Sequence, residues 1–178
     1  MHRFDRRHAL KSLALGTAAS LGVPAAGTAA APVAKGVESF AVDVLVCGGG
    51  TAGIAAACCA ARHGAKVVLL ERWPSLGGMA TNALVNIWHT SDRSKQVIHG
   101  FVQEAVERGG RFVQRMSHYP KRPETHVFDP AGMRVVFYRM LKDAGVRILC
   151  NLTAVESIVE GGRMVCVLVD TKTGRKAV

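Results

Sequence analysis

The sequence predicts an α/β fold in which a β-α-β unit on a parallel sheet is followed by a C-terminal β-meander. An apolar run over 42–46 leads through glycines into an alanine-rich stretch, 51–63, and then into a second apolar run, 66–71. Such runs are typical of strands buried on both faces of a parallel sheet, whereas alanine favours helix between them. After Gly145, short strand-like runs are separated by glycine turns, which is typical of a meander.

Composition restricts the class of protein. The chain has 178 residues, enough for one domain or for one domain and part of another, and 49% of them are hydrophobic, which excludes a disordered chain. The formal net charge is +10, but the basic residues are scattered with few aromatics between them, so we expect no nucleic-acid partner. Five cysteines without a Cys-x-x-Cys pair argue against a disulfide scaffold or a zinc ribbon.

Residues 1–31 are predicted to be an export signal, because a charged stretch containing Arg6-Arg7 precedes an apolar run, 12–23, and a tract of small residues. As a helix, that apolar run reaches only roughly 18 Å, short of the ~30 Å core of a bilayer, so we expect no stable membrane span. The paired arginines resemble a twin-arginine (Tat) signal, which implies the Tat export machinery as a partner and a periplasmic or secreted location. An ordinary Sec signal or a disordered basic tail is the alternative. Residues 32–40 are expected to form a linker to a domain over 41–178.

The middle of the chain is expected to alternate between loop and helix. Residues 72–92 are predicted to form a loop, since proline and paired glycines interrupt them before mixed polar and aromatic residues. Apolar residues at helical spacing predict a helix over 94–108, ending before Gly109-Gly110. Residues 115–127 contain two prolines and are predicted to be irregular.

A further helix is predicted to open at Asp129-Pro130, an N-cap followed by proline at the first helical position, and to end at Gly145. Its apolar face consists of Met133, Val136, Phe137, Met140 and Leu141. A strand over 146–150 follows, and then two or three strands joined at Gly161-Gly162 and Thr173-Gly174.

The motif Gly48-Gly49-Gly50-Thr51-Ala52-Gly53 fits Gly-x-Gly-x-x-Gly, and its context makes it specific. It follows a buried strand and opens a helix, and the next strand ends in an acid, Glu71, 23 positions after Gly48. Gly48 permits the tight turn, Gly50 lets the main chain approach a pyrophosphate, and Gly53 lets the helix pack closely on the strand. Glu71 is placed to accept both hydroxyls of an adenosine ribose. The pattern predicts a Rossmann-like dinucleotide-binding unit; a glycine turn in an ordinary α/β domain is the alternative.

A second glycine pair follows in Leu76-Gly77-Gly78-Met79-Ala80-Thr81. A nicotinamide domain has no need of it, whereas an FAD site does, because the longer cofactor extends past this loop. With Glu71-Arg72 these motifs resemble the FAD-dependent oxidoreductase family of the glutathione-reductase-like FAD/NAD(P)-binding superfamily, from about Ala41 to the C-terminus and most specifically through Asn82.

The resemblance implies FAD as cofactor and a small-molecule substrate that passes a hydride to the flavin. It assigns cofactor contacts as follows: Gly48, Gly50 and Gly53 at the pyrophosphate, Glu71 at the ribose, Arg72 by the adenine or ribose, Gly77, Gly78 and Met79 along the path to the flavin, and backbone groups around Ala154-Val155 at the adenine. It assigns no catalytic residue. Because relatives continue into an Ala-Thr-Gly-Asp type motif and a substrate domain, the chain is expected to be truncated. An NAD-dependent dehydrogenase and a truncated, non-catalytic dinucleotide-binding module are the alternatives.

Cysteines and histidines carry weaker expectations. Disulfide reductases of the superfamily place two redox cysteines shortly after the glycine pair, where this chain has residues 79–82 without cysteine, so a thiol–disulfide mechanism is not expected. We expect all five cysteines to be packing residues. His89 is expected to be a plain loop residue, with general acid–base work on a substrate as the alternative. No histidine spacing predicts a metal site.

Overall fold

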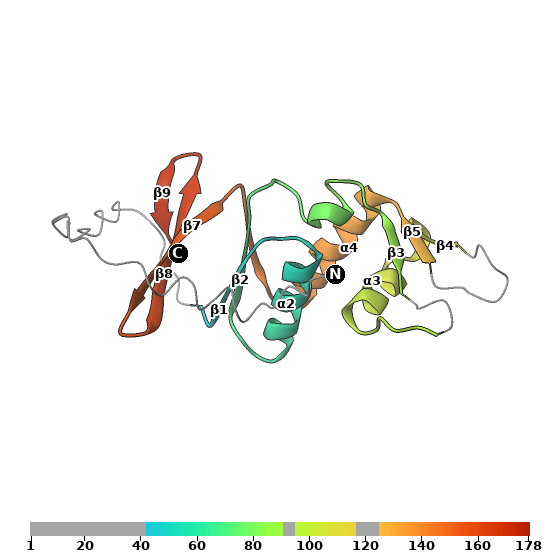
Figure 1. Ribbon diagram of the computed structural model, residues 1–178, viewed down its shortest axis with the longest axis horizontal. Helices are drawn as coiled ribbons and strands as arrows, with labels where there is room; N and C mark the ends of the chain where they lie inside the picture. The colour runs from blue at the N-terminus through green and yellow to red at the C-terminus, as the bar shows by residue number, and fades with distance from the viewer. Residues whose placement is uncertain (1–41, 91–94, 117–124) are drawn as a thin grey trace, which may run out of the picture. The chain divides into compact units, whose positions relative to one another are not determined.

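A computed structural model describes residues 42–90, 95–116 and 125–178 (Figure 1). The predicted export signal over 1–31 and the linker over 32–40 lie outside the described residues. The chain divides into two units, Met1–Pro32 and Val33–Val178, and every described residue belongs to the second. In the three described ranges, no helix is both long and apolar enough to cross a bilayer.

The predicted parallel sheet is confirmed. It consists of β1 (Val44–Cys47), β2 (Val67–Glu71) and β6 (Arg147–Cys150) in the order β1-β2-β6, with both pairs parallel. Helix α2 (Thr51–Arg62) connects β1 to β2, as the alanine-rich stretch predicts. All five residues of β2 are buried, because the strand lies in the middle of the sheet. The register places the carboxyl ends of the strands at one edge, where the glycine turn also lies (Figure 1).

Helix α4 (Pro130–Asp143) begins and packs as the sequence predicts. The Asp129 side chain caps it by accepting hydrogen bonds from the N–H groups of Ala131, at 3.2 Å, and Gly132, at 2.9 Å. Its five predicted apolar residues are all buried in the main core, together with residues of α2, β2 and α3 (Phe101–Gly109). This core fixes α2, and with it the glycine turn, against the sheet.

A small antiparallel sheet corrects two predictions. The predicted loop 72–92 contains a short 3-10 helix, η1 (Gly78–Ala80), and strand β3 (Ile87–His89). The range predicted to be irregular, 115–127, begins in β4 (Val113–Met116) and ends in β5 (Thr125–Phe128). The strand order is β3-β5-β4. Strands of three or four residues are too short to show a periodic pattern in the sequence. They are stabilised by pairing with each other and by the Trp88 ring, whose centroid lies 4.7 Å from that of the Phe128 ring.

Helix α3 begins later than predicted, at Phe101 instead of residue 94. The N–H groups of Val97 and Ile98 both donate to the Thr90 carbonyl oxygen, at 2.9 and 3.0 Å, and the backbone turns at Gly100 with φ +68°. The apolar spacing that predicts one helix therefore covers two structures, a loop that ends at Gly100 and the helix that follows it. Val97 and Ile98 remain exposed because they precede the helix face that packs. After α3, a 3-10 turn, η2 (Gly110–Phe112), leads into β4.

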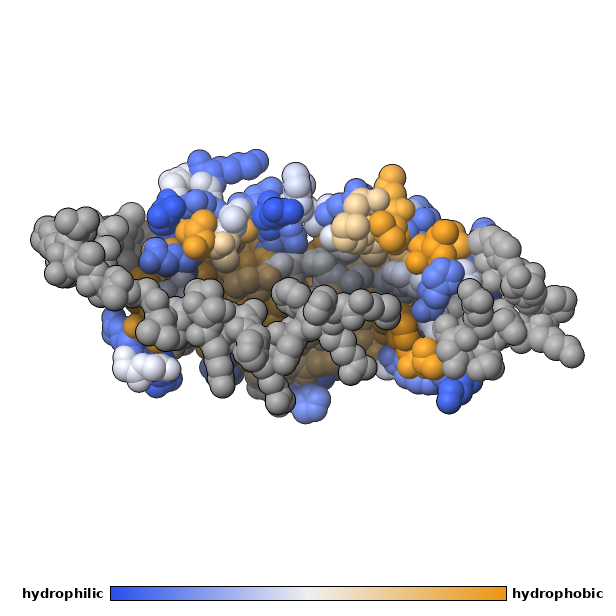
Figure 2. Space-filling model, in the orientation of Figure 1, coloured by the Kyte–Doolittle hydropathy of each residue, from blue (hydrophilic) through white to orange (hydrophobic). Residues whose placement is uncertain are grey.

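The predicted meander is confirmed as β7 (Thr153–Glu160), β8 (Arg163–Thr171) and β9 (Gly174–Ala177), joined by turns at Gly161-Gly162 and near Thr173-Gly174. Val167 and Val169 of β8 form a second buried cluster with Val68 and Leu70 of β2. The meander thus covers the face of the parallel sheet opposite to the helices and brings the start of β7 close to the end of β2. Elsewhere apolar side chains reach the surface, and Figure 2 shows such a patch on the side where η1 and β3 lie in Figure 1.

Candidate functional site

The glycine turn joins β1 to α2, and its geometry requires glycine at two positions. Gly48 has φ +115°, which glycine adopts without strain, and its N–H donates to the Leu70 carbonyl oxygen at 2.8 Å. A Cβ atom on Gly53 would lie 1.9 Å from the Gly48 carbonyl oxygen. Only glycine therefore lets the first turn of α2 pack this closely on the preceding loop.

The N-terminus of α2 faces open space. Gly50 is its N-cap, with φ −73° and no side-chain cap hydrogen bond, so among the described residues no side chain caps the N–H groups at the start of the helix, at Thr51, Ala52 and Gly53. A Cβ atom on Gly50 would meet no other atom within 4 Å. Free N–H groups and the positive end of the helix dipole together favour an anion such as a diphosphate.

Glu71 ends β2 beside this turn and is held by two backbone donors. Its side chain is buried, with the residue 5% exposed; Oε2 accepts from the Gly49 N–H at 2.6 Å and Oε1 from the Trp73 N–H at 2.8 Å. A Cβ atom on Gly49 would lie 3.0 Å from Oε2, so glycine is needed for this approach. Each carboxylate oxygen has two lone pairs, and each therefore keeps capacity for one further donor, such as a ribose hydroxyl. Sequence spacing placed Glu71 here, but nothing in the sequence indicates that the Gly49 amide is used to hold it.

The two glycine turns lie against each other. Gly77, with φ +105°, donates its N–H to the Gly49 carbonyl oxygen at 2.7 Å and forms a parallel bridge with Gly50. A Cβ atom on Gly78 would lie 3.0 Å from the Gly50 Cα. The residues predicted to lie along the path to the flavin thus begin beside the glycine turn. The last of them, Met79, has an exposed side chain.

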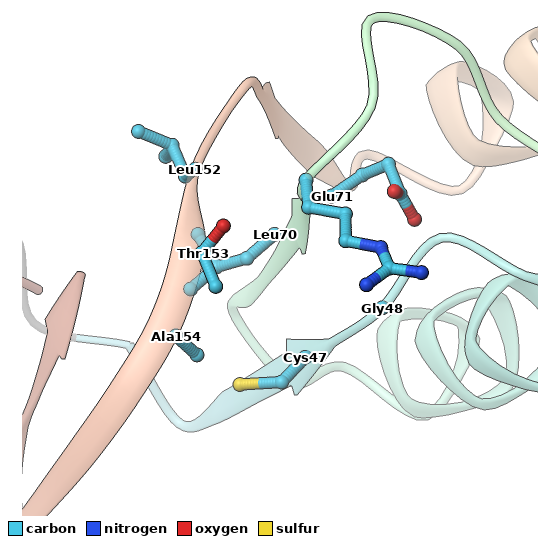
Figure 3. Close-up of a pocket in the computed structure, with 8 residues that line it drawn as sticks. Cys47, Gly48, Leu70, Glu71, Leu152, Thr153 and Ala154 are labelled. Atoms are coloured by element: carbon cyan, nitrogen blue, oxygen red, sulfur yellow. The ribbon is translucent and has the colours of Figure 1, made fainter. Parts of the chain in front are cut away.

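A pocket of about 210 Å³ opens at the carboxyl ends of β1 and β2 (Figure 3). It is lined by Cys47, Gly48, Leu70, Glu71, Arg72, Leu152, Thr153 and Ala154. Gly48, Glu71, Arg72 and Ala154 were predicted cofactor contacts, whereas the other four were not named as such. The available signal was topological, since 152–154 follow directly after a parallel strand whose carboxyl end must lie at this edge.

Val155, the remaining predicted residue, does not line this pocket. The pairing of β7 with β8 shifts register between Ala154 and Glu156, which leaves Val155 as the extra residue of a β-bulge. Its side chain is exposed and lines a neighbouring hollow with Leu45 and Met164. Ala154, one residue earlier, does line the pocket, so of the two residues named for the adenine only Ala154 lies in its lining.

The cysteines are all free thiols. Burial raises the pKa of the Cys58 and Cys150 thiols, so both stay protonated at neutral pH and are poor nucleophiles. Cys47 and Cys59 differ from their prediction as packing residues, because both are exposed, and Cys47 also lines the pocket.

His89 lies in β3 instead of a loop, and its Nδ1 is 3.2 Å from the Thr125 Oγ1. Within 42–90, 95–116 and 125–178, no group of three or more His, Cys, Asp or Glu side chains is placed to hold a metal ion.

Comparison with known proteins decides the family. The model of a family described as FAD dependent oxidoreductase matches residues 43–178, which is most of the chain. The chain belongs to the FAD-dependent oxidoreductase family. FAD is the family's cofactor and the cofactor of this chain, and the NAD-dependent dehydrogenase alternative is not favoured.

Solved structures of other proteins share the fold of this chain. Thermovibrio ammonificans THI4 is 19% identical with a TM-score of 0.53, over 77% of this chain and 54% of that chain. A 3-ketosteroid-delta4-(5alpha)-dehydrogenase from Rhodococcus jostii is 16% identical with a TM-score of 0.54, over 82% of this chain and 46% of that one. The chain thus spans about half the length of these structures.

The described residues fit the adenosine diphosphate half of FAD. The space in front of Gly50 is open, the α2 N-terminus offers N–H donors, and Glu71 keeps acceptor capacity beside a pocket of suitable position. These features belong to three separate segments of the chain that meet at one edge of the sheet.

Proposed function

We propose that this chain supplies the FAD site of an exported oxidoreductase in which a small-molecule donor passes a hydride to the flavin. The observation that carries the proposal is the convergence of the α2 N-terminus, the Glu71 carboxylate and the adjoining pocket at one edge of the parallel sheet. The family match supports FAD chemistry, and the paired arginines at 6–7 support export to the periplasm or beyond. When bound, FAD supplies a ring that accepts a hydride, while the protein binds and orients it.

Each segment has a distinct task in this proposal. The N–H groups at the start of α2 hold the diphosphate, because the bare Gly50 backbone leaves room for it. Glu71 accepts the ribose hydroxyls on the lone pairs that Gly49 and Trp73 leave open. Backbone and side-chain atoms of 152–154 and of Arg72 surround the adenine. Gly78 and Met79 lie toward the flavin.

Two glycine substitutions separate cofactor binding from folding. Gly50→Ala adds a methyl group that meets no protein atom, so the free energy of unfolding should change by no more than about 1 kcal/mol. The same methyl group enters the space proposed for the diphosphate, and we expect FAD affinity to fall at least about tenfold, or about 1.4 kcal/mol. Gly53→Ala forces a methyl group onto the Gly48 carbonyl oxygen and should cost several kcal/mol of stability.

The measurement is FAD titration followed by flavin fluorescence and by absorbance at about 450 nm, with urea unfolding of each variant. If the unaltered chain binds no flavin nucleotide, the proposed function is wrong. If Gly50→Ala binds FAD as tightly as the unaltered chain, the diphosphate lies elsewhere. Gly53→Ala serves as the folding control, since its defect should appear without any ligand.

A further inference from the structure

Trp73 lies on the loop directly after β2, next to the pocket. Its indole is 53% exposed and belongs to neither buried apolar cluster of the described residues. Its backbone is fixed, because the Trp73 N–H donates to the Glu71 Oε1 at 2.8 Å. The side chain therefore starts from a fixed backbone position beside Glu71, and its ring is not part of the core.

The Trp73 ring contacts the guanidinium of Arg72. The Arg72 Cζ lies 5.5 Å from the ring centroid, within the range of a cation–π interaction. In the described part of the chain, Arg72 makes no ion pair with a carboxylate, so this ring contact is what restrains its side chain. Arg72 also lines the pocket at the ends of β1 and β2. An arginine held in place loses less conformational entropy when a ligand arrives than one that moves freely.

We propose that Trp73 is a positioning residue that holds the Arg72 guanidinium in place for stacking on the adenine ring of FAD. This inference rests on the proposed function. A guanidinium plane stacks on nucleobase faces, and the contact with the indole limits the positions that the guanidinium can take. The pair thereby favours FAD over FMN, which has the same flavin but no adenine.

A double-mutant cycle on the full chain tests the role, with FAD and FMN as the probes. Trp73→Ala should weaken FAD binding about two- to fivefold, the factor that an exposed cation–π contact of 0.5–1 kcal/mol gives, and leave FMN binding unchanged. Trp73→Phe, which keeps an aromatic face, should restore most of the FAD affinity. In an Arg72→Ala background, Trp73→Ala should have no further effect, because the ring then has nothing to hold.

Trp73→Leu provides a second variant that keeps apolar bulk without an aromatic face, and it should behave as Trp73→Ala does. Additive losses of FAD affinity in the cycle, or a Trp73→Leu variant that binds FAD normally, would overturn the positioning role. An equal loss of FAD and FMN binding would overturn it as well. An unaltered chain that fails to bind FAD would instead reject the proposed function, so the two failures are distinguishable.

Discussion

Glu71 connects the fold to the cofactor at the level of a single side chain. Its two oxygens accept hydrogen bonds from the Gly49 and Trp73 amides, so contacts within the protein orient the acid. Preorganisation of this kind removes part of the entropy cost of binding. The same contacts make the side chain a structural element, because a buried carboxylate with two N–H donors cannot be replaced without leaving a donor unsatisfied.

Glu71→Gln tests both roles. The amide NH₂ must face one of the two backbone N–H groups, so we expect the free energy of unfolding to fall by about 1–3 kcal/mol and FAD binding to weaken by a similar amount. Glu71→Lys places a cation against both donors and should have a larger effect on each. Urea unfolding and FAD titration measure the two quantities. Glu160→Gln, at an exposed position of β7, is the control and should alter neither. Unchanged FAD affinity in Glu71→Gln would contradict the ribose role.

At the level of residues, the sequence predicts the positions that belong to the glycine motif, but not the features that depend on tertiary structure. The spacing from Gly48 to Glu71 is a property of the β-α-β unit, and it placed the acid correctly beside the turn. The role of Gly49 could not be predicted, because its missing Cβ matters only when Glu71 approaches it. The position of Val155 outside the pocket that Ala154 lines goes with a β-bulge, which has no clear mark in the sequence.

At the scale of elements, an ion-pair network joins α2, which begins at the glycine turn, to α3 and α4. Arg62 at the end of α2 donates from Nη1 and Nη2 to the two Glu104 oxygens of α3, at 2.7 and 2.8 Å. Arg108 bridges Glu104 to Asp143 of α4, at 2.9 and 2.6 Å. The hydrogen bonds from Arg62, with the added charge of Arg108, lower the pKa of the Glu104 carboxyl below its ordinary 4.5. Because the network is partly exposed, it should contribute about 1 kcal/mol or less.

Glu104→Gln should therefore lower the free energy of unfolding at neutral pH by about 1 kcal/mol. A depressed folded-state pKa gives stability that is present above the ordinary carboxyl value and is lost as pH falls through the folded value. The difference between the unaltered chain and Glu104→Gln should thus shrink on acidification below about pH 4.5. Urea unfolding across pH measures it. Glu107→Gln makes the same charge change on α3, where Glu107 accepts from Gln103 and has no ion pair within the described ranges, and it should show no such trend. A difference independent of pH would contradict the network's role.

Elements were predictable where local sequence determines them. The Asp129 cap and the apolar spacing of α4 are local signals, as are the buried runs of β1 and β2. The β3-β5-β4 sheet is different, because its strands are short, β3 lies far from β5 in sequence, and the strands are stabilised by each other and by the Trp88–Phe128 contact. The early start predicted for α3 failed because the apolar spacing runs on through Gly100, whose positive φ turns the chain.

For the whole molecule, the prediction concerns export, and it depends on residues outside the described ranges. If Arg6-Arg7 form a twin-arginine signal, Arg6→Lys with Arg7→Lys should leave the precursor in the cytoplasm, because that pathway recognises the arginine pair. Cell fractionation with detection of the precursor and the processed form measures the outcome. A charge-preserving change elsewhere in the signal, Lys11→Arg, should leave export intact. Normal export of the double-lysine variant would favour a Sec signal instead.

The bracing of Glu71 by Gly49 and Trp73 has a consequence for redesign of nucleotide preference. A site for a nucleotide with a 2′-phosphorylated ribose must lose this carboxylate, because like charges repel. Here that change also removes the hydrogen-bond acceptor of two backbone amides, that of Gly49 in the glycine turn and that of Trp73 next to Arg72. A successful redesign must therefore supply a new acceptor for both amides, and libraries that vary position 71 alone should return few folded clones.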